Sequence, residues 1–162
     1  SDPENARYQG WDAPFPADVA RQFIEEMMRE EPAVPGTCYQ LAMERRDDGR
    51  LLGDCAIHFR GDQPHQAEIG FTLERSAQGH GYATEAVHAV LAYLFDELDY
   101  HRVAASCDAD NVRSARLLER VGMRREAYFI ESYWFKGRWT SEYHYALLQR
   151  EWRSRLAASD PA

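Results

Sequence analysis

The sequence predicts an α/β domain, and three observations support this fold class. Apolar and polar residues alternate over several short segments, as in β-strands that bury one face. Two glycines, Gly79 and Gly81, separate one of these segments from a long amphipathic helix. A second helix begins at Asn111 and ends at Gly122, directly after another strand-like segment. Strands and helices that alternate in this way form a sheet with helices packed on it.

The hydrophobic pattern places the elements in order along the chain. The opening up to Pro16 indicates a loop or a frayed helical end, and the tail after Glu151 shows only a short helix around Trp152. The expected helices cover residues 18–29, 82–98 and 111–122. The expected strands cover residues 39–44, 51–59, 67–73, 102–107, 128–135 and 139–148.

The composition fits one domain with an acidic surface. Of the 162 residues, 44% are hydrophobic and 12% aromatic, which is enough to bury a core. The formal net charge is −8, and the sequence shows no basic stripe or arginine cluster, so we expect no nucleic-acid partner. An acidic surface suits a cationic acceptor such as an amine, although it also serves solubility alone. We see no membrane-spanning run and no signal peptide, and we expect no membrane partner.

Cysteine and histidine spacing predicts neither disulfides nor a metal site. Cys38, Cys55 and Cys107 are odd in number, widely spaced and set in apolar strand-like runs. We therefore interpret them as reduced core thiols of a cytoplasmic protein. The six histidines show no His-x-x-x-His spacing and the cysteines no Cys-x-x-Cys spacing, so we expect no metal ion.

The segment QGHGYA at 78–83 joins a strand to the N-terminus of a helix. Glycines there leave backbone N–H groups unpaired and pointing in one direction, beside the positive end of the helix dipole. Such a loop can hold a diphosphate, but a glycine pair before a helix is also a common tight turn. The helix that starts at Asn111, at a matching distance along the chain, favours the diphosphate.

These motifs together resemble a known family. The loop at 78–83 is similar to a Gln/Arg-x-x-Gly-x-Gly/Ala motif, and Asn111, Ser114, Leu118 and Gly122 have the spacing of an Asn-led helix with a terminal glycine. Both motifs, in this order of elements, resemble the GNAT N-acetyltransferases. The resemblance implies a mixed, mostly antiparallel sheet that is splayed in its middle and flanked by helices. It also implies an enzyme that moves an acetyl group from acetyl-CoA directly to a primary amine.

Three further runs resemble one branch of this family. They are GYATEA at 81–86, LLERVGM at 117–123 and FKGRW at 135–139, and they are similar to the RimJ/RimL enzymes that acetylate ribosomal proteins on alanine or serine. The resemblance covers roughly residues 5–150. We interpret residues 1–162 as a single GNAT domain whose first strand is missing from the chain, since the sequence enters partway through the family's first helix.

The resemblance assigns acetyl-CoA to the glycine loop and to the strand before it. The N–H groups of 78–83 would hold the pyrophosphate, and the strand backbone would pair with the pantetheine amides. Phe71 and Leu73 would also pack in the core, while the side chains of His80 and Tyr82 have no further role. The expected acetyl-CoA contacts are Phe71, Thr72, Leu73, Gln78, Gly79, His80, Gly81, Tyr82, Ala83, Asn111 and Ser114.

Two residues are candidates for the chemistry of acetyl transfer, which needs a neutral amine and a stabilised leaving thiolate. Glu68, at the start of the cofactor strand, is the first candidate for a general base acting through a water; the alternative is a solvated strand-end carboxylate. Ser114 lies one turn into its helix and would stabilise the thiolate, unless it is an ordinary surface serine. Glu131 is a weaker candidate for the base.

Other polar groups nearby have simpler explanations. Asp108 and Asp110 fit the turn before the second helix, and Cys107 fits a buried structural thiol rather than a nucleophile. Many relatives place a tyrosine, as general acid, seven residues after the asparagine, and here that position holds Leu118. The ribosomal-protein branch often lacks this tyrosine too, so Leu118 does not exclude activity.

An aromatic set near the C-terminus suggests either a wall of the acceptor pocket or a dimer contact. We expect most of it to pack inside a two-stranded edge, with one of the two tryptophans exposed at a rim. The set consists of Tyr128, Phe129, Tyr133, Trp134, Phe135 and Trp139.

Three function classes follow. The first is acetyl transfer to a protein N-terminus or a small-molecule amine, by a protein that the resemblance allows to be a homodimer. The second is a non-catalytic acyl-CoA sensor or regulatory module, which the missing tyrosine keeps open. The third, a nucleotide hydrolase, fits poorly, because no Gly-Lys-Ser/Thr follows the glycine loop.

Overall fold

Six strands form one sheet in the order β1-β2-β3-β4-β6-β5. The computed structural model describes residues 2–159. All neighbouring strands are antiparallel except β3 and β4, which are parallel. The mixed, mostly antiparallel sheet is therefore confirmed. The strands are β1 (Cys38–Glu44), β2 (Leu51–Phe59), β3 (Gln66–Leu73), β4 (Arg102–Asp108), β5 (Arg124–Phe135) and β6 (Arg138–Leu148).

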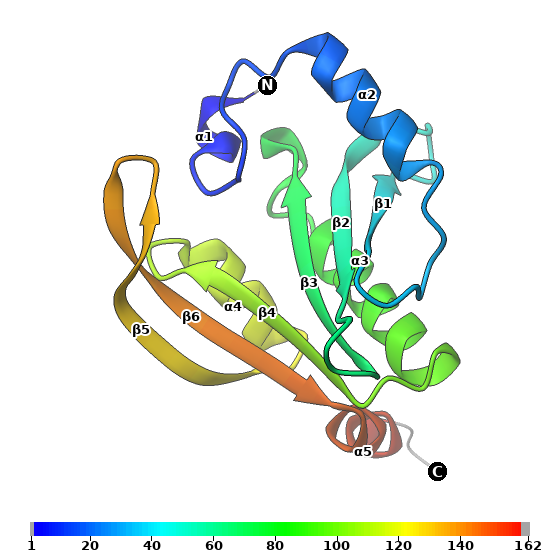
Figure 1. Ribbon diagram of the computed structural model, residues 1–162. Coiled ribbons are helices and arrows are strands. Elements are labelled where there is room, and N and C mark those ends of the chain that lie inside the picture. The colour runs from blue at the N-terminus through cyan, green and yellow to red at the C-terminus, as the bar shows by residue number, and fades with distance from the viewer. Residues whose placement is uncertain (1, 160–162) are drawn as a thin grey trace.

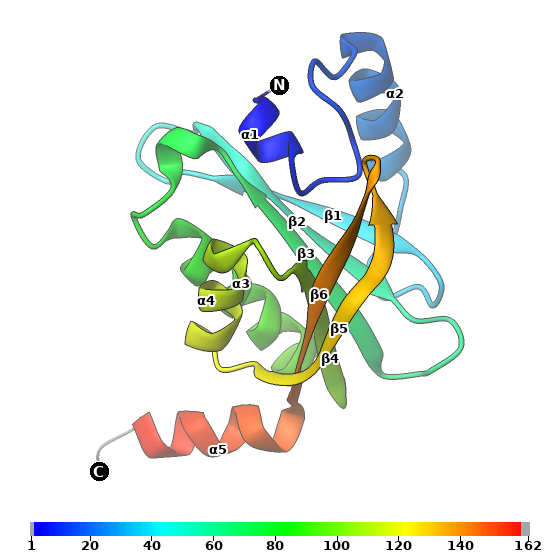
Figure 2. The ribbon, with the colours of Figure 1, turned by 90° about the vertical axis from the view of Figure 1, so that its left-hand side faces the viewer.

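Helices flank this sheet on one face and at both ends. Figures 1 and 2 show α3 and α4 on one face, α1 and α2 near the end to which β3 points, and α5 at the opposite end. No helix within residues 2–159 is long and apolar enough to cross a lipid bilayer. The helices are α1 (Pro3–Ala6), α2 (Ala17–Met27), α3 (Tyr82–Ala92), α4 (Val112–Arg120) and α5 (Gln149–Ser159).

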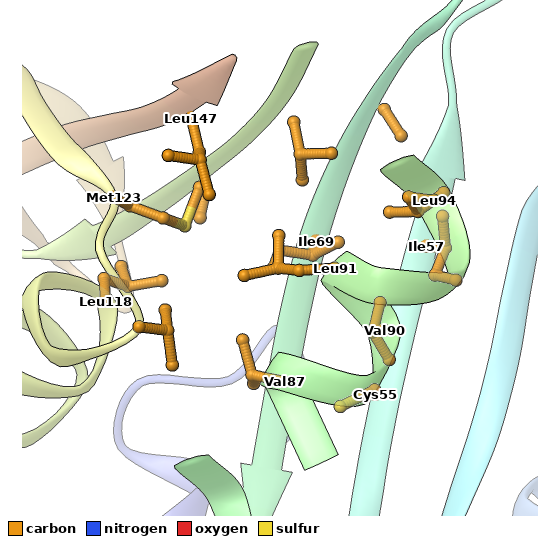
Figure 3. Close-up of a cluster of buried hydrophobic side chains, with 14 of the residues drawn as sticks. Cys55, Ile57, Ile69, Val87, Val90, Leu91, Leu94, Leu118, Met123 and Leu147 are labelled. Atoms are coloured by element: carbon orange, nitrogen blue, oxygen red, sulfur yellow. The ribbon is translucent and has the colours of Figure 1, made fainter. Parts of the chain in front are cut away.

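The core lies between the sheet and the face of α3 and α4 (Figure 3). Ile69 of β3 lies beside Leu91 of α3, and Met123 lies between Leu118 of α4 and Leu147 of β6. The predicted stripe of the 82–98 helix continues through a π-helical turn after α3, Tyr93–Glu97. At the far end Trp152 of α5 is buried and donates its indole N–H to Asp96 at 3.0 Å. Burial of these side chains fixes α3 and α4 on the sheet.

The three cysteines are free thiols, as predicted, but only one is deeply buried. Cys55 lies in the core, whereas Cys38 and Cys107 are half-buried. Burial raises the pKa of Cys55 to about 12 and that of Cys107 to about 11. A protonated thiol at neutral pH agrees with a structural role for Cys107.

The aromatic set on β5 and β6 does not pack as predicted. Tyr128, Phe129 and Tyr133 are about half exposed, and both tryptophans are exposed, with Trp134 at 57% and Trp139 at 56%. The two indole rings contact each other at 5.4 Å in a T-shaped arrangement. The expectation of a mostly buried set was wrong because this hairpin extends beyond α3 and α4, so no second layer covers it (Figure 1).

One strand boundary and the burial of one helix also differ from the sequence prediction. β5 begins at Arg124, four residues before the predicted 128, because Arg124 pairs with Ala146 of β6 although its own side chain is exposed. The predicted apolar face of α2 buries none of its residues, and Ile24 is 56% exposed. Alternation reports apolar side chains and therefore missed the backbone pairing at the start of β5. Amphipathicity also reports apolar side chains and therefore did not predict that α2 stays exposed.

Gly53 on β2 fixes how closely β3 can lie beside it. A Cβ built on Gly53 would stand 2.0 Å from the carbonyl oxygen of Thr72, which is a backbone atom that cannot move alone. Gly53→Ala should therefore push the two strands apart and lower the free energy of unfolding by about 1–3 kcal/mol, the usual cost of overpacking. Urea denaturation followed by circular dichroism would measure the change.

Gly10→Ala is the control for this prediction. A Cβ on Gly10 meets nothing within 4 Å. Its effect should be within about 0.5 kcal/mol. Equal stability of Gly53→Ala and the parent protein would contradict the close packing of β2 and β3.

Candidate active site

The site begins where β3 and β4 separate. Only three residue pairs join the two strands, the last being Glu68 with Ala104. Beyond this point β3 pairs only with β2, and β4 only with β6. Figure 1 shows the two strands meeting at one end and diverging towards the other. The splayed sheet that the family resemblance implies is therefore present.

The separation leaves backbone groups of β3 facing the gap. In an antiparallel pair only every second residue exchanges hydrogen bonds with a given neighbour. Glu74, just after β3, donates its N–H to Leu52 at 2.7 Å, so the even-numbered residues face β2. The N–H and C=O groups of Ile69, Phe71 and Leu73 then face the gap. An extended chain with amide groups could pair with them, as a further strand would.

The glycine loop lies at the far end of this strand and carries free donors. Gly79 and Gly81 have φ angles of +82° and +87°, and a Cβ on either would meet nothing within 4 Å. Gln78 donates its N–H to Arg75, and Glu85 is the first residue of α3 to donate within the helix, to Gly81. Between them, no hydrogen bond to any described residue uses the N–H groups of 79–84.

These free N–H groups stand at the N-terminus of α3, where the helix dipole adds positive potential. A loop of this geometry can bind an anion such as a diphosphate. The donor set begins one residue later than the sequence prediction, because the N–H of Gln78 is already used in the loop.

A cleft of about 870 Å³ joins the strand, the loop and the start of α4. Of the eleven predicted acetyl-CoA contacts, the structure brings nine to this cleft. The nine are Phe71, Thr72, Leu73, Gln78, Gly79, Gly81, Ala83, Asn111 and Ser114.

The remaining two residues, His80 and Tyr82, turn their side chains back on the loop. The ring Nδ1 of His80 lies 2.9 Å from the carbonyl oxygen of Gln78, and its ring stacks on that of Tyr82 with centroids 5.8 Å apart. The Tyr82 hydroxyl also bonds Arg45 of the β1–β2 turn, so neither side chain lines the cleft.

Five arginines line the cleft, and the sequence analysis missed them. They come from three separate parts of the chain, so no basic cluster is visible along the sequence. The signal was present on α4, where positions i, i+3 and i+7 fall on one helix face. The five are Arg7, Arg75, Arg113, Arg116 and Arg120. The cleft also contains the carboxylates of Glu4 and Asp110, so the five arginines leave it with an excess of positive charge in a protein whose formal net charge is −8.

The N-terminal segment forms one wall of the cleft. The side-chain amide of Asn5 donates to the carbonyl oxygen of Leu73 at 3.0 Å, and that of Gln78 donates to the same oxygen at 3.2 Å. The oxygen of the Gln78 amide accepts from Arg113 of α4. Lys136 of the β5–β6 hairpin anchors the segment by donating to the carbonyl oxygen of Ala6 at 2.7 Å. A gap-facing carbonyl is thus satisfied by two side-chain amides.

The start of α4 presents Ser114 to the cleft. Asn111 caps the helix, since its side-chain oxygen accepts from the N–H of Ser114 at 3.2 Å. The Ser114 hydroxyl forms no hydrogen bond with any described residue. Leu118, at the position of the family's tyrosine, is buried at 1% exposure in the core. No phenol therefore reaches the cleft from that position.

Glu68 stands at the closed end of the split, outside the residues that line the cleft. Its carboxylate accepts from the hydroxyl of Ser106 on β4 at 3.0 Å. Glu131, the alternative base, lies in a bulge of β5 with φ +46°, and its N–H donates to the Ser141 hydroxyl. Only Glu68 lies on one of the two splayed strands.

Asp108 and Asp110 belong to the turn before α4. Asp108 accepts from the N–H of Asp110 at 2.8 Å, and its carbonyl accepts from the N–H of Asn111 at 2.9 Å. Arg138 pairs with both carboxylates, at 3.3 and 3.4 Å. Their partners are structural, as the sequence analysis proposes.

Comparison with known proteins points to one family. A family model described as an acetyltransferase (GNAT) domain matches residues 1–124. The chain is 37% identical over 107 residues to the uncharacterized N-acetyltransferase YnaD of Bacillus subtilis, covering 66% of this chain and 62% of that protein. It is 31% identical over 105 residues to the putative ribosomal N-acetyltransferase YdaF of the same species, covering 65% and 57%. The chain thus spans about three fifths of both relatives.

A solved structure shares the fold over nearly the whole chain. It is an acetyltransferase of the GNAT family from Bacillus anthracis, with a TM-score of 0.82 and 31% sequence identity. The match covers 93% of this chain and 85% of that chain. The chain therefore shares the overall fold of a GNAT acetyltransferase over nearly its whole length.

Gly81→Ala should weaken binding of CoA. Alanine in the left-handed conformation of Gly81 costs about 1–2 kcal/mol, and the loop would relax away from the geometry that aligns its N–H groups. We expect the Kd for CoA, measured by calorimetry, to rise about tenfold.

Gly137→Ala is the matched control, because Gly137 has φ +80° and open space around it but lies at the tip of the β5–β6 hairpin. It should leave the Kd for CoA within about twofold. An equal loss of CoA affinity in both variants would contradict a specific role for the loop.

Proposed function

Because the chain belongs to the GNAT acetyltransferase family, we propose that it transfers the acetyl group of acetyl-CoA to a primary amine. The observation that carries this proposal is that three kinds of group line one cleft. They are the gap-facing backbone of β3, the free N–H groups of residues 79–84 and five arginine side chains. Together they suit a molecule with an amide-bearing arm and phosphates.

The residues present fit CoA on chemical grounds. Gly79 and Gly81 leave open space above a loop whose N–H groups lack partners, as a diphosphate requires. Phe71 and Leu73 direct backbone amides to the gap, as pantetheine requires. Arg113, which lies near enough to bond Gln78, supplies charge for a phosphate.

When bound, acetyl-CoA would supply the acetyl group as an activated thioester. We assign Glu68 to accept a proton from the incoming ammonium, directly or through a water, because an amine attacks only when neutral. Ser106 would hold the Glu68 carboxylate in place through their 3.0 Å hydrogen bond. We assign the Ser114 hydroxyl to stabilise the leaving thiolate, because it faces the cleft with its donor unused.

The acceptor class has two candidates within this proposal. The relative named as a putative ribosomal N-acetyltransferase supports a protein N-terminus. A small-molecule amine is the alternative, because fold and cofactor loop do not select the acceptor. The free thiols support a cytoplasmic location, and the exposed aromatic hairpin is compatible with a homodimer contact.

A non-catalytic acyl-CoA sensor is the second candidate function. The buried Leu118 favours it, since no tyrosine acid is available at that position. A sensor would bind acetyl-CoA but turn over none of the amines offered.

Release of free thiol from acetyl-CoA distinguishes these functions. The acceptor panel would contain peptides with N-terminal Ser, Ala and Thr beside polyamines, amino sugars and amino acid derivatives. Turnover on peptides alone would indicate protein N-terminal acetylation, and turnover on a small amine would indicate a metabolite enzyme. Tight binding of CoA with no turnover on the whole panel would favour the sensor.

Ser114→Ala should lower kcat by roughly 10–100-fold, since the thiolate would lose a donor in the cleft. The KM for acetyl-CoA should stay within about twofold, because cofactor contacts elsewhere remain. Steady-state kinetics with Ser154→Ala on α5 as control would test this; the Ser154 hydroxyl only bonds the Arg150 carbonyl. An unchanged kcat in Ser114→Ala would remove the thiolate role.

Glu68→Gln should lower kcat roughly 100-fold near pH 7 and by less at high pH, where more of the amine is already neutral. The dependence of kcat on pH would be measured for both proteins. Glu131→Gln tests the competing base in the same experiment. If Glu68→Gln kept the parent pH profile while Glu131→Gln changed it, the assignment would pass to Glu131.

A further inference from the structure

Gly70, in the middle of β3, has no structural reason to be a glycine. A Cβ built on it meets nothing within 4 Å, and its backbone does not adopt a positive φ. Gly53, on the neighbouring strand, is the contrast, because its Cβ would stand 2.0 Å from a backbone oxygen. Glycine inside a strand weakens the strand and often marks a place where a ligand comes close.

Gly70 lies at the point where the sheet opens. It is the second residue beyond Glu68, which forms the last pair with β4. Because side chains alternate along a strand, Glu68, Gly70 and Thr72 face one side of the sheet, and Ile69 faces the core. Ser106 of β4 bonds to Glu68 and so shares this side. The open space above Gly70 therefore adjoins the proposed base, on the face that α3 and α4 leave uncovered (Figure 1).

This face of the sheet is acidic around Gly70. Strand register places four carboxylates of β2, β3, β4 and β6 on it, two on either side of the split. The four are Asp54, Glu68, Asp108 and Glu142. Arg102 of β4 shares this face and is paired with Glu126 of β5. Arg138 forms an ion pair with Asp108, and His58 and His144 lie on the same face.

Asp54 is held in a network on this face. Its carboxylate accepts from the side-chain amide of Gln40 and from the hydroxyl of Thr72, which also lines the cleft. Burial raises the pKa of Asp54. The arginine-lined cleft and this acidic face thus meet at the split with opposite charge, which separates an anionic donor from a cationic acceptor.

We propose that Gly70 determines acceptor specificity: the space above it admits the carbon chain of a primary amine that has no neighbouring carboxylate. The ammonium group approaches Glu68 over Gly70, from the acidic face, while CoA occupies the cleft. The acidic face repels an amine that carries its own carboxylate, such as a free amino acid. This inference rests on the proposed acetyl transfer.

Bisubstrate compounds test the inference by binding, without requiring turnover. One compound joins CoA through an S–CH₂–CO link to alaninamide, and its partner joins CoA to alanine, which ends in a carboxylate. Calorimetry would compare both with CoA alone. In the parent protein we expect the alaninamide compound to bind at least tenfold tighter than CoA and about tenfold tighter than the alanine compound.

Gly70→Ala and Gly70→Val fill the space in two steps. We expect Gly70→Val to abolish the tenfold gain of the alaninamide compound over CoA, with Gly70→Ala intermediate, while the Kd for CoA itself stays within twofold. Ala42→Val is the control, since Ala42 is exposed on the same face of β1, two strands from the split. Ala42→Val should keep the full tenfold gain in affinity of the alaninamide compound over CoA. Melting curves should show all three variants folded, as valine favours strands.

The outcomes separate this inference from the proposed function. An unchanged gain in Gly70→Val, or no gain of the alaninamide compound in the parent protein, would overturn the role of Gly70. Equal affinity of the two bisubstrate compounds would overturn the exclusion of carboxylates. Failure of CoA alone to bind the parent protein would instead contradict the proposed acetyl-CoA function.

Discussion

The end of parallel pairing between β3 and β4 is the constraint on which the site depends. Three residue pairs hold the strands together, and the sheet then divides while each strand keeps its outer neighbour. In a divided sheet, backbone N–H and C=O groups along the split have no strand partners. Such groups require other hydrogen-bond partners. Asn5 and Gln78 satisfy the carbonyl of Leu73 in this way. A ligand with its own amides can satisfy the rest, so the fold itself creates a need for an extended amide-bearing molecule.

Packing in the core stabilises the sheet despite this division. Ile69 and Val103 stay buried on the two strands at the point of separation, and α3 and α4 pack beneath them. Leu118 belongs to this core, which shows that its position supports the cleft from below. The helices therefore hold the two halves of the sheet at a fixed separation, and their N-terminal ends supply the loop and Ser114 at the rim.

Positive and negative side chains are separated around the split, although the net charge of the protein is strongly negative. Five arginines line the cleft, and Asp54, Glu68, Asp108 and Glu142 share the face of the sheet that meets it at the split. A formal net charge of −8 gives no hint of this division. Local fields steer ligands more than the overall charge does. One sheet opening can therefore receive a polyanionic donor and a cationic acceptor from two directions.

The sequence predicted the parts of the site that depend on local chain geometry. Gly79 and Gly81 indicate a loop, and Asn111 indicates a helix N-cap, because the backbone conformation at these positions restricts which residue types fit. The arginines of the cleft were missed because Arg7, Arg75 and Arg120 meet only through tertiary folding.

Burial was harder to predict than secondary structure. The aromatic hairpin has the alternation of a buried strand pair, yet no layer covers it, and alternation cannot report what lies above a strand. Gly70 carried no signal in the sequence, since a single strand glycine has many explanations. Its significance depends on the open space around it, since no atom of the protein lies where a Cβ of residue 70 would make contact.

Amide hydrogen exchange with and without CoA tests the central claim most directly. We predict that CoA slows exchange of the Phe71 and Leu73 amides, and of those in 79–84, by at least about tenfold, because they would become donors to the ligand. Amides of β1, two strands away, should not change. Calorimetric binding of CoA without protection of these amides would contradict the account, since CoA would then lie outside the split between β3 and β4.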